Sequence, residues 1–243
     1  MGYFNRFNKL TNEDFMAIGA GLYPGIRSVT MQGILTDTPI VRADLISWAT
    51  TYVFPSDAGE TLQVVSTLAD TQLVTVVGLN ELFESVVATV QLNGTTPVNL
   101  PGLWTRVNVL TNSDETEFTG IIDVTNGVNI FCRMLAIDQT SVMGVYSVPA
   151  GYRSQVLAIT AELIKSIGNS DDFIQADLYF RSPGNVFKRT ISVGLQRRGS
   201  TASQIINLAP RGIVGPIDLL VKIQASSADF SSIVRVDFIE QKV

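Results

Sequence analysis

Hydrophobic and polar residues alternate with a period of two through most of the chain from Ser28 onward. In an extended strand this alternation places apolar side chains on one face of a sheet and polar side chains on the other. The segments that show it are short and rich in Val, Ile, Thr and aromatic residues. They are VTMQGIL, TTYVF, TLQVVS, QLVTVVG, VVATVQL, TRVNVL, IFCRMLAI, GVYSV, SQVLAITAELI, FIQADLYFR, VFKRTISVGL, QIINL, IDLLVKIQAS and SIVRVDFIE. The pattern predicts an all-β fold of antiparallel β-sandwich or jelly-roll units.

Turn-forming residues separate these segments. Asn93-Gly94 and Asn126-Gly127 lie between alternating runs. Asn-Gly is a strong hairpin signal because a type I′ turn needs positive φ at both central residues. Pro55-Ser56-Asp57 marks another turn. In Ser182-Pro183-Gly184-Asn185, proline in the second position and glycine in the third predict a type II turn.

The chain divides into three predicted parts. Residues 1–27 form an N-terminal extended arm, residues 28–148 a first β-sandwich domain, and residues 149–243 a second, jelly-roll-like β-sandwich domain. The boundary between the two domains is placed at Pro149-Ala150-Gly151, where turn residues interrupt the alternation. A single larger sandwich with an elaborate edge is the alternative, because periodicity does not give the order of strands in a sheet.

The predicted arm is rich in aromatic residues but has no sustained period. Residues 11–18 could form one or two helical turns, since Thr11 precedes Asp14 as in a capping motif. An aromatic segment without a core of its own is expected to contact another protein, or to fold back over its own domain. The aromatic residues of the arm predicted to lie in an interface are Tyr3, Phe4, Phe7, Phe15 and Tyr23.

The chain of 243 residues contains no histidine. Without the usual general base and commonest metal ligand, it cannot form a Ser-His-Asp triad, a Cys-His pair or a histidine-ligated zinc site. Its net charge of −5 is opposite to the basic balance of a nucleic-acid-binding protein. No apolar run approaches the roughly 18 residues of a membrane helix, and the first residues lack a signal-peptide pattern. We therefore expect no nucleic acid and no membrane among its partners.

Carboxylates and one thiol are the remaining groups with reactive potential. The acidic clusters, each beside loop-forming residues, are Glu81 with Glu84, Asp114 with Glu115 and Glu117, and Asp171 with Asp172. Paired carboxylates can hydrolyse glycosides without histidine, but nothing in the sequence brings such a pair together from separate strands, so we expect no catalytic residue. Residues 112–115 and 169–172 lack EF-hand spacing, so ordinary acidic turns without metal or cofactor are expected, with structural calcium as the alternative. Cys132 lies in an alternating segment and is predicted to be a buried structural thiol.

Aromatic and basic side chains supply candidate contact surfaces. Trp48, Trp104 and Tyr152 could bind a sugar or fill the core. Trp104, at the start of a strand, could also be half-exposed in an interface. Tyr179 lies on the polar face of FIQADLYFR and is predicted to lie in an interface. A solvated hairpin or a subunit contact explains the basic cluster more simply than phosphate binding; it comprises Lys188, Arg189, Arg197, Arg198 and Arg211.

Residues 74–109 contain a motif that goes beyond strand alternation. An apolar strand ends in V-x-G-L, an acidic residue and a second strand lead to L-N-G-T-T-x-V, and a third strand carries R-V-N. The motif consists of Val77, Gly78, Leu79, Glu84, Leu92, Asn93, Gly94, Thr95, Thr96, Val98, Arg106, Val107 and Asn108, with looser matches at 52–55 and 146–151. This pattern resembles structural proteins of tailed bacteriophage virions, marine phages especially.

The resemblance implies a virion structural protein rather than an enzyme, assembled in the host cytoplasm and located in the virion. Within that class we expect a capsid-surface decoration or cement protein. It would form a homo-oligomer, a trimer in the favoured case, and contact the major capsid protein or other virion proteins. A tail or fibre-attachment component is one alternative, and a carbohydrate- or receptor-binding β-sandwich module is another.

Overall fold

The computed structural model describes residues 25–36, 38–39, 41–165, 173–196, 201–207, 212–226 and 230–243. The five aromatic residues of the predicted arm lie outside these ranges, as do Asp171, Asp172, Arg197, Arg198 and Arg211. In the described ranges the chain is all-β, its strands pair antiparallel, and no helix is found that could cross a membrane. The strands are β1 (Ile26–Leu35), β2 (Ala43–Asp44), β3 (Gln63–Ser66), β4 (Leu73–Asn80), β5 (Ser85–Gln91), β6 (Val98–Asn99), β7 (Trp104–Asn112), β8 (Ile122–Thr125), β9 (Ile130–Met134), β10 (Val145–Val148), β11 (Tyr152–Lys165), β12 (Phe173–Arg181), β13 (Lys188–Gln196), β14 (Thr201–Asn207), β15 (Gly212–Val214), β16 (Ile217–Ala225) and β17 (Phe230–Lys242).

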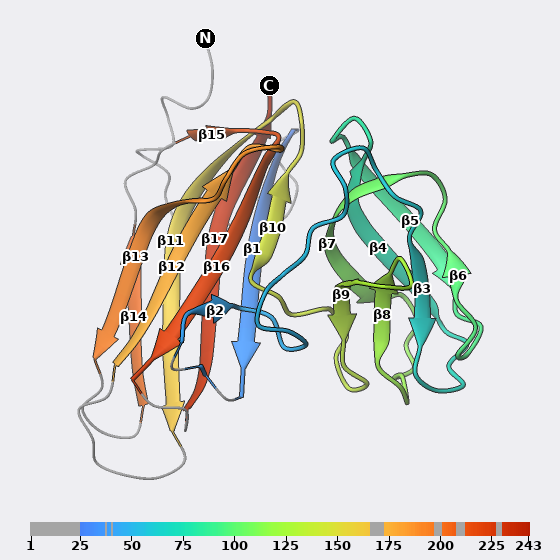
Figure 1. The fold of residues 1–243 in the computed structure, drawn as a ribbon, viewed down its shortest axis with the longest axis horizontal. Helices are drawn as coiled ribbons and strands as arrows, with labels where there is room; N and C mark the ends of the chain where they lie inside the picture. The colour runs from blue at the N-terminus through green and yellow to red at the C-terminus, as the bar shows by residue number, and fades with distance from the viewer. Residues whose placement is uncertain are drawn as a thin grey trace.

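The strands form two lobes that lie side by side (Figure 1). The large lobe contains β1, β2 and β10 to β17. One of its sheets has the order β1-β17-β11-β14, with β15 also on β11, and the other has the order β10-β16-β12-β13, with β2 also on β16. The inserted lobe, residues 46–143, contains sheets of order β6-β3-β8-β9 and β5-β4-β7.

Each lobe has its own hydrophobic core. In the large lobe, apolar residues from both sheets pack together: Met31, Leu45, Tyr146, Val148, Val156, Ile159, Ala161, Ile174, Ala176, Leu178, Val193, Leu219, Val221, Ile223, Ala225, Val234, Val236 and Phe238. The core of the inserted lobe is built around Trp104, Leu110, Ile122 and Phe131. Two large-lobe residues, Val145 of β10 and Leu220 of β16, also pack in this second core. The lobes are therefore joined by apolar contacts as well as by the chain.

The pairing of β1 differs from the predicted domain boundary. β1 pairs with β17 along its whole length, from Ile26 opposite Gln241 to Leu35 opposite Ser232. β2 and β10 likewise pair with β16. The predicted division between residues 148 and 149 would separate these partners, so it does not match the sheets. The chain instead starts the large lobe, forms the inserted lobe between β2 and β10, and then returns to complete the large lobe.

Most of the predicted strand segments are confirmed, but TTYVF is wrong. Residues 50–54 contain no strand, because this backbone is bonded by a side chain instead of a ladder: Tyr52 N–H donates to Asp44 Oδ2 at 2.7 Å. A glycine with positive φ occupies each predicted turn, with φ of 58° at Gly94, 88° at Gly127 and 74° at Gly184. Phe83 is the only residue other than glycine with positive φ in the described ranges, so the type I′ geometry predicted at the two Asn-Gly pairs is wrong. Asn185 N–H donates to the Ser182 carbonyl at 3.0 Å, which closes the predicted turn.

Candidate functional site

A buried cluster of charged side chains joins the two lobes. Arg106 of β7, in the inserted lobe, donates from Nε to Asp218 Oδ1 at 2.6 Å and from Nη2 to Asp218 Oδ2 at 2.9 Å. Asp218 belongs to β16 of the large lobe, and both side chains are 1% exposed. Asp218 also accepts from Arg181 Nε at 2.9 Å and from Ser147 Oγ at 2.7 Å. Every oxygen of this buried carboxylate is therefore bonded, as burial of a charge requires.

Arg106 has a second acidic partner at the edge of the cluster. Its Nη2 donates to Asp57, which is partly exposed, as well as to Asp218. Burial by itself would lower the pKa of Arg106, but the hydrogen bonds and charges of Asp218 and Asp57 raise it, and the net pKa lies above the ordinary value. The guanidinium group is therefore a permanent cation that holds two carboxylates from different parts of the chain.

Aromatic rings surround the two guanidinium groups. The Cζ atom of Arg106 lies 5.2 Å from the ring centroids of both Phe54 and Phe83. Arg181 Cζ lies 4.3 Å from the Phe54 ring and 4.6 Å from the Phe187 ring. Cations over aromatic faces gain electrostatic attraction, most where water is excluded. The rings thus stabilise the charges and exclude water from the ion pairs.

Backbone contacts reinforce the junction. Asn108 Nδ2 donates to the Ser147 carbonyl at 2.9 Å, and Ser147 N–H donates to Asn108 Oδ1 at 2.8 Å. Ala150 N–H donates to the carbonyl of Phe83 at 2.8 Å, again from the large lobe to the inserted lobe. Phe83 has a φ of 58°, which is uncommon for a residue with a side chain. The tight turn at Phe83 thus presents both its ring and its carbonyl to the junction.

Several of the motif residues meet at this junction. Arg106 and Asn108 come from R-V-N, and Ser147 and Ala150 from the looser downstream match. Gly78 lies directly behind them, where an added Cβ would be 2.1 Å from the Arg106 carbonyl oxygen and 3.0 Å from the Trp104 ring. The sequence marked these positions as a motif, but nothing in it indicated that they would contact a second lobe.

The predicted aromatic contact residues have different environments. Trp104 is 0% exposed and its indole N–H donates to the Pro101 carbonyl at 2.9 Å, so the predicted interface role is wrong and core filling is correct. Tyr179 is half-buried, with its ring 5.7 Å from Lys222 Nζ. Tyr152 lies under Arg27, with the Cζ atom 4.8 Å from its ring centroid. Trp104 therefore has no surface with which to bind a sugar.

The acidic clusters form ordinary turns where they are described. Asp114 Oδ2 accepts from Leu73 N–H at 2.6 Å, and Asp114 N–H donates to Asn112 Oδ1 at 2.9 Å. Glu81, Glu84, Glu115 and Glu117 are exposed. Among the residues placed by the structure, no three His, Cys, Asp or Glu side chains lie close enough to hold a metal ion. Cys132 is buried as predicted, and burial raises the pKa of its thiol to about 12.

One buried carboxylate was missed by sequence reasoning. Asp70 is 3% exposed and accepts four hydrogen bonds of 2.6–2.9 Å, from Ser66 Oγ, from the N–H and hydroxyl of Thr119, and from Gly120 N–H. Burial raises its pKa, but these hydrogen bonds lower it by more, and the net pKa lies below the ordinary value. Asp70 therefore ties the 119–120 loop to β3 and is a structural acid.

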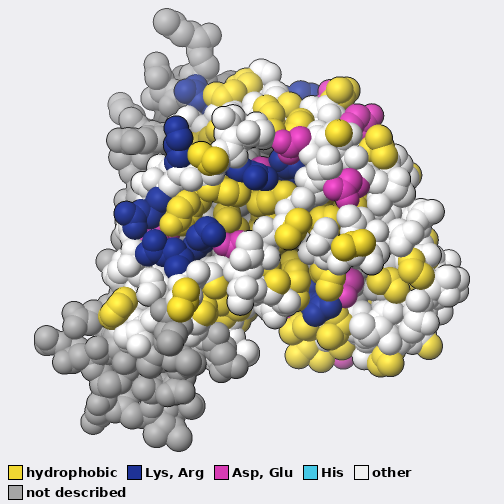
Figure 2. Space-filling model, in the orientation of Figure 1, with side chains coloured by type: hydrophobic (Ala, Val, Ile, Leu, Met, Phe, Trp, Pro, Cys, Tyr) yellow, Lys and Arg dark blue, Asp and Glu magenta, His cyan; other side chains and the backbone are white. Residues whose placement is uncertain are grey.

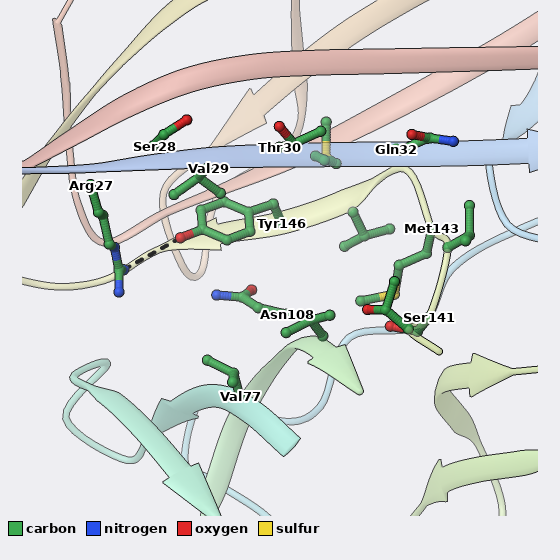
Figure 3. A pocket seen from close by; sticks show the side chains of 15 residues that line it. Arg27, Ser28, Val29, Thr30, Gln32, Val77, Asn108, Ser141, Met143 and Tyr146 are labelled. Atoms are coloured by element: carbon green, nitrogen blue, oxygen red, sulfur yellow. Dashed lines mark hydrogen bonds between the residues drawn. The ribbon is translucent and has the colours of Figure 1, made fainter. Parts of the chain in front are cut away.

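A cleft of about 530 Å³ separates β1 from the inserted lobe (Figure 3). Asn108, Val77 and Ser141 line one side, and Arg27 and Tyr146 line the other, with Arg27 Nη2 donating to Tyr146 Oη at 3.5 Å. Burial raises the pKa of Tyr146 well above its ordinary value, so its hydroxyl remains protonated at neutral pH. The cleft thus holds polar side chains that can bind, but its tyrosine cannot serve as a base.

Comparisons with known proteins assign no family. No family model matches the chain, and no curated protein matches it significantly. Among solved structures, the chain is similar to the structure of infectious bursal disease virus Gt strain. The two are 14% identical, the match covers 90% of this chain and 75% of the viral chain, and the TM-score is 0.24. The structure of the Gx strain of that virus is 11% identical, with a TM-score of 0.27, and the structure of its VP2 subviral particle is 12% identical, with a TM-score of 0.21. Both matches cover 90% of this chain and 76% of the other chain. Matches at these TM-scores do not establish a shared fold.

Proposed function

We propose that the chain is a structural protein of a virus particle and that it acts through contacts, without catalysis. The observation that carries the proposal is the Arg106–Asp218 junction, where residues of the phage-like motif join two lobes. A catalytic site keeps at least one group accessible and tuned for reaction. The charged groups of the junction are instead bonded to one another, which suits a structural protein whose two lobes must keep a fixed relative position.

Within that class the proposed role is a capsid-surface decoration or cement protein. Two lobes held in a fixed relative position give one copy two separate contact surfaces. An ordinary interface buries roughly 800 Å² per partner, so two or three such contacts would hold a copy in place. The proposed partners are the major capsid protein and further copies of the chain, with a trimer favoured. The proposed fold of the large lobe is a jelly-roll-like sandwich, since residues of both its sheets share one core.

Position in the particle distinguishes the proposed role from its alternative. A tail or fibre-attachment component would use the same rigid junction but would be present in few copies. A carbohydrate- or receptor-binding module is less well supported, because Trp104, one of its candidate aromatic residues, has no exposed surface.

Quantitative mass spectrometry of purified particles tests the proposal. Particles of the virus that encodes the chain would be washed in high salt, and its peptides counted relative to those of the major capsid protein. A ratio near one, or a simple fraction of one, is expected for a decoration protein. A ratio far below that would favour the tail alternative. Loss of the chain from infectious, washed particles would refute a virion role.

A further inference from the structure

The two parts of the chain carry opposite net charges. Residues 46–143, the inserted lobe, contain 10 of the 22 acidic residues but only 2 of the 17 basic residues, a net charge of −8, so the rest of the chain carries +3. Both basic residues of the lobe have acidic partners: Arg106 bonds to buried Asp218, and Arg133 Nε lies 2.7 Å from Asp123. The outer surface of the inserted lobe is therefore acidic.

The large lobe has a basic face, which we define as Arg42, Arg181, Arg189 and Lys222. Arg42 and Arg189 lie 3.0 and 3.8 Å from Asp177, and Lys222 lies 2.7 Å from Asp44. The carboxylates are at most 2% exposed, whereas the three cations are 28–51% exposed, so positive charge faces outward. Figure 2 shows Lys and Arg side chains gathered on this lobe beside a patch of hydrophobic side chains.

A cleft of about 570 Å³ adjoins the basic face at the junction of the lobes. Phe54, Phe187 and Leu220 give it apolar walls, and Arg181 and Lys222 place cations on its rim. Asp44 and Asp57 also line it, but they are paired with Lys222 and Arg106. This combination fits an apolar side chain that is flanked by carboxylates. A site with an apolar pocket and a charged rim is the common form of a protein contact.

The turn between β4 and β5 has the complementary chemistry. Leu82 is 65% exposed and lies between Glu81 and Glu84, which are also exposed. The turn is well ordered by its own bonds, because Asn80 Oδ1 accepts from the N–H groups of Leu82 and Glu84, each at 2.9 Å. A turn already in its bound shape loses little conformational entropy on docking.

We propose that the Glu81–Glu84 turn of one copy docks on the basic face of a second copy. Leu82 enters the cleft beside Phe54 and Phe187, and the two glutamates face the cations on its rim. The contact joins two different patches, so it forms either a two-fold pair in which each copy supplies its turn to the other, or a ring or filament of successive contacts. The contact rests on the proposed role as an assembling structural protein, but it is a property of the purified chain and is testable without particles.

Charge exchange on the full-length chain tests this contact by sedimentation velocity over a range of concentrations. Glu84→Lys and Arg189→Glu each place like charges together and are expected to weaken self-association by roughly tenfold or more. The double variant restores opposite charges in every contact and is expected to associate within roughly threefold of the unmodified chain. Glu115→Lys makes the same change of net charge elsewhere on the inserted lobe, and it should leave association unchanged. Near-ultraviolet circular dichroism checks that each variant is folded.

Several outcomes would overturn the contact. Association that Glu84→Lys and Arg189→Glu leave intact would place the contact elsewhere, and so would a double variant that stays weak while folded. An equal loss with Glu115→Lys would show that net charge, not this turn, controls association. A full-length chain that stays monomeric at all concentrations would remove the contact, whereas the virion role is decided separately by the peptide ratio in particles.

Discussion

Arg106 and Asp218 lie 112 positions apart in the sequence, yet they form a doubly hydrogen-bonded pair between two lobes. The loss of water around two buried charges offsets much of their attraction, so such a pair adds little to stability as a whole. Removal of one member is different, because it leaves the other charge buried and poorly compensated. The pair therefore fixes a specific geometry at the junction: each lobe supplies one charge of the pair, and Asp57 and Arg181 give Arg106 and Asp218 a second partner each.

Arg106→Ala is expected to lower the free energy of unfolding by about 3–5 kcal/mol, since Asp218 stays buried without its bidentate partner. Arg106→Lys should also be destabilising, because an ammonium group cannot make two parallel bonds to one carboxylate. Urea denaturation measures both effects. Arg235→Ala is the control, since it breaks the exposed Arg235–Asp237 pair and should cost less than about 1 kcal/mol. Equal costs for Arg106→Ala and Arg235→Ala would contradict this account of the junction.

Gly78→Ala is expected to destabilise the chain by about 1–3 kcal/mol or more, because the new methyl group would overlap the Arg106 carbonyl and the Trp104 ring. Gly194→Ala is the matched control on another strand, where an added Cβ has no heavy atom within 4 Å. It should be neutral within about 0.5 kcal/mol. Thermal unfolding of the two variants compares them directly, and a harmless Gly78→Ala would show that β4 can move away from β7.

Asp70→Asn should destabilise the chain at neutral pH by about 1–3 kcal/mol, because the amide presents a donor to groups that already donate. The pKa of Asp70 is lower in the folded chain than in the unfolded chain. The stabilisation of the fold by the Asp70 carboxylate is therefore fully present above the unfolded pKa of about 3.9, and it is lost as pH falls through the folded pKa. The difference between the unmodified chain and Asp70→Asn should therefore shrink below about pH 4. Denaturation at pH 7 and pH 3 measures it.

Glu115→Gln provides the control for Asp70, since it removes an exposed carboxylate from the same lobe. It should change the free energy of unfolding by less than about 0.5 kcal/mol at either pH. A gap between Asp70→Asn and the unmodified chain that stays constant down to pH 3 would show that the carboxylate charge is not what the 119–120 loop recognises.

Cys132 should be inert to thiol reagents in the folded chain. Its thiol is buried, and its pKa of about 12 leaves almost no thiolate at neutral pH. Ellman's reagent is expected to modify the chain only after denaturation, with one thiol per chain. Modification of the folded chain at the rate of a free thiol would mean that β9 opens readily.

Alternation predicted most of the strands correctly, TTYVF excepted, because it depends only on neighbouring residues. Ile174, Ala176 and Leu178 were predicted to share a face and are all buried in the large-lobe core. Alternation is the same whichever strand lies alongside, so the pairing of β1 with β17 could not be read from it. The predicted domain boundary failed for this reason.

The junction could be located only in part. Arg106 and Asn108 stood out as polar residues of a motif, on one face of an apolar strand. Their partners Asp218 and Ser147 lie in distant segments, and a contact between distant segments leaves no local pattern. Trp104 follows Pro101-Gly102-Leu103 at the start of a strand, a position compatible with both surface and core. It is buried because Gly78, without a side chain, leaves space for its ring.

The order of strands in the first sheet makes folding of the large lobe depend on synthesis of β17. β17, the last strand of the described residues, lies between β1 and β11 and pairs with both. A ribosome adds roughly 5–20 residues per second, so β1 waits for the rest of the chain before its ladder can form. A product that stops before Phe230 leaves β1 and β11 without the strand that connects them. The first strand of the large lobe therefore gains its partner only after the inserted lobe and the rest of the large lobe have been synthesised.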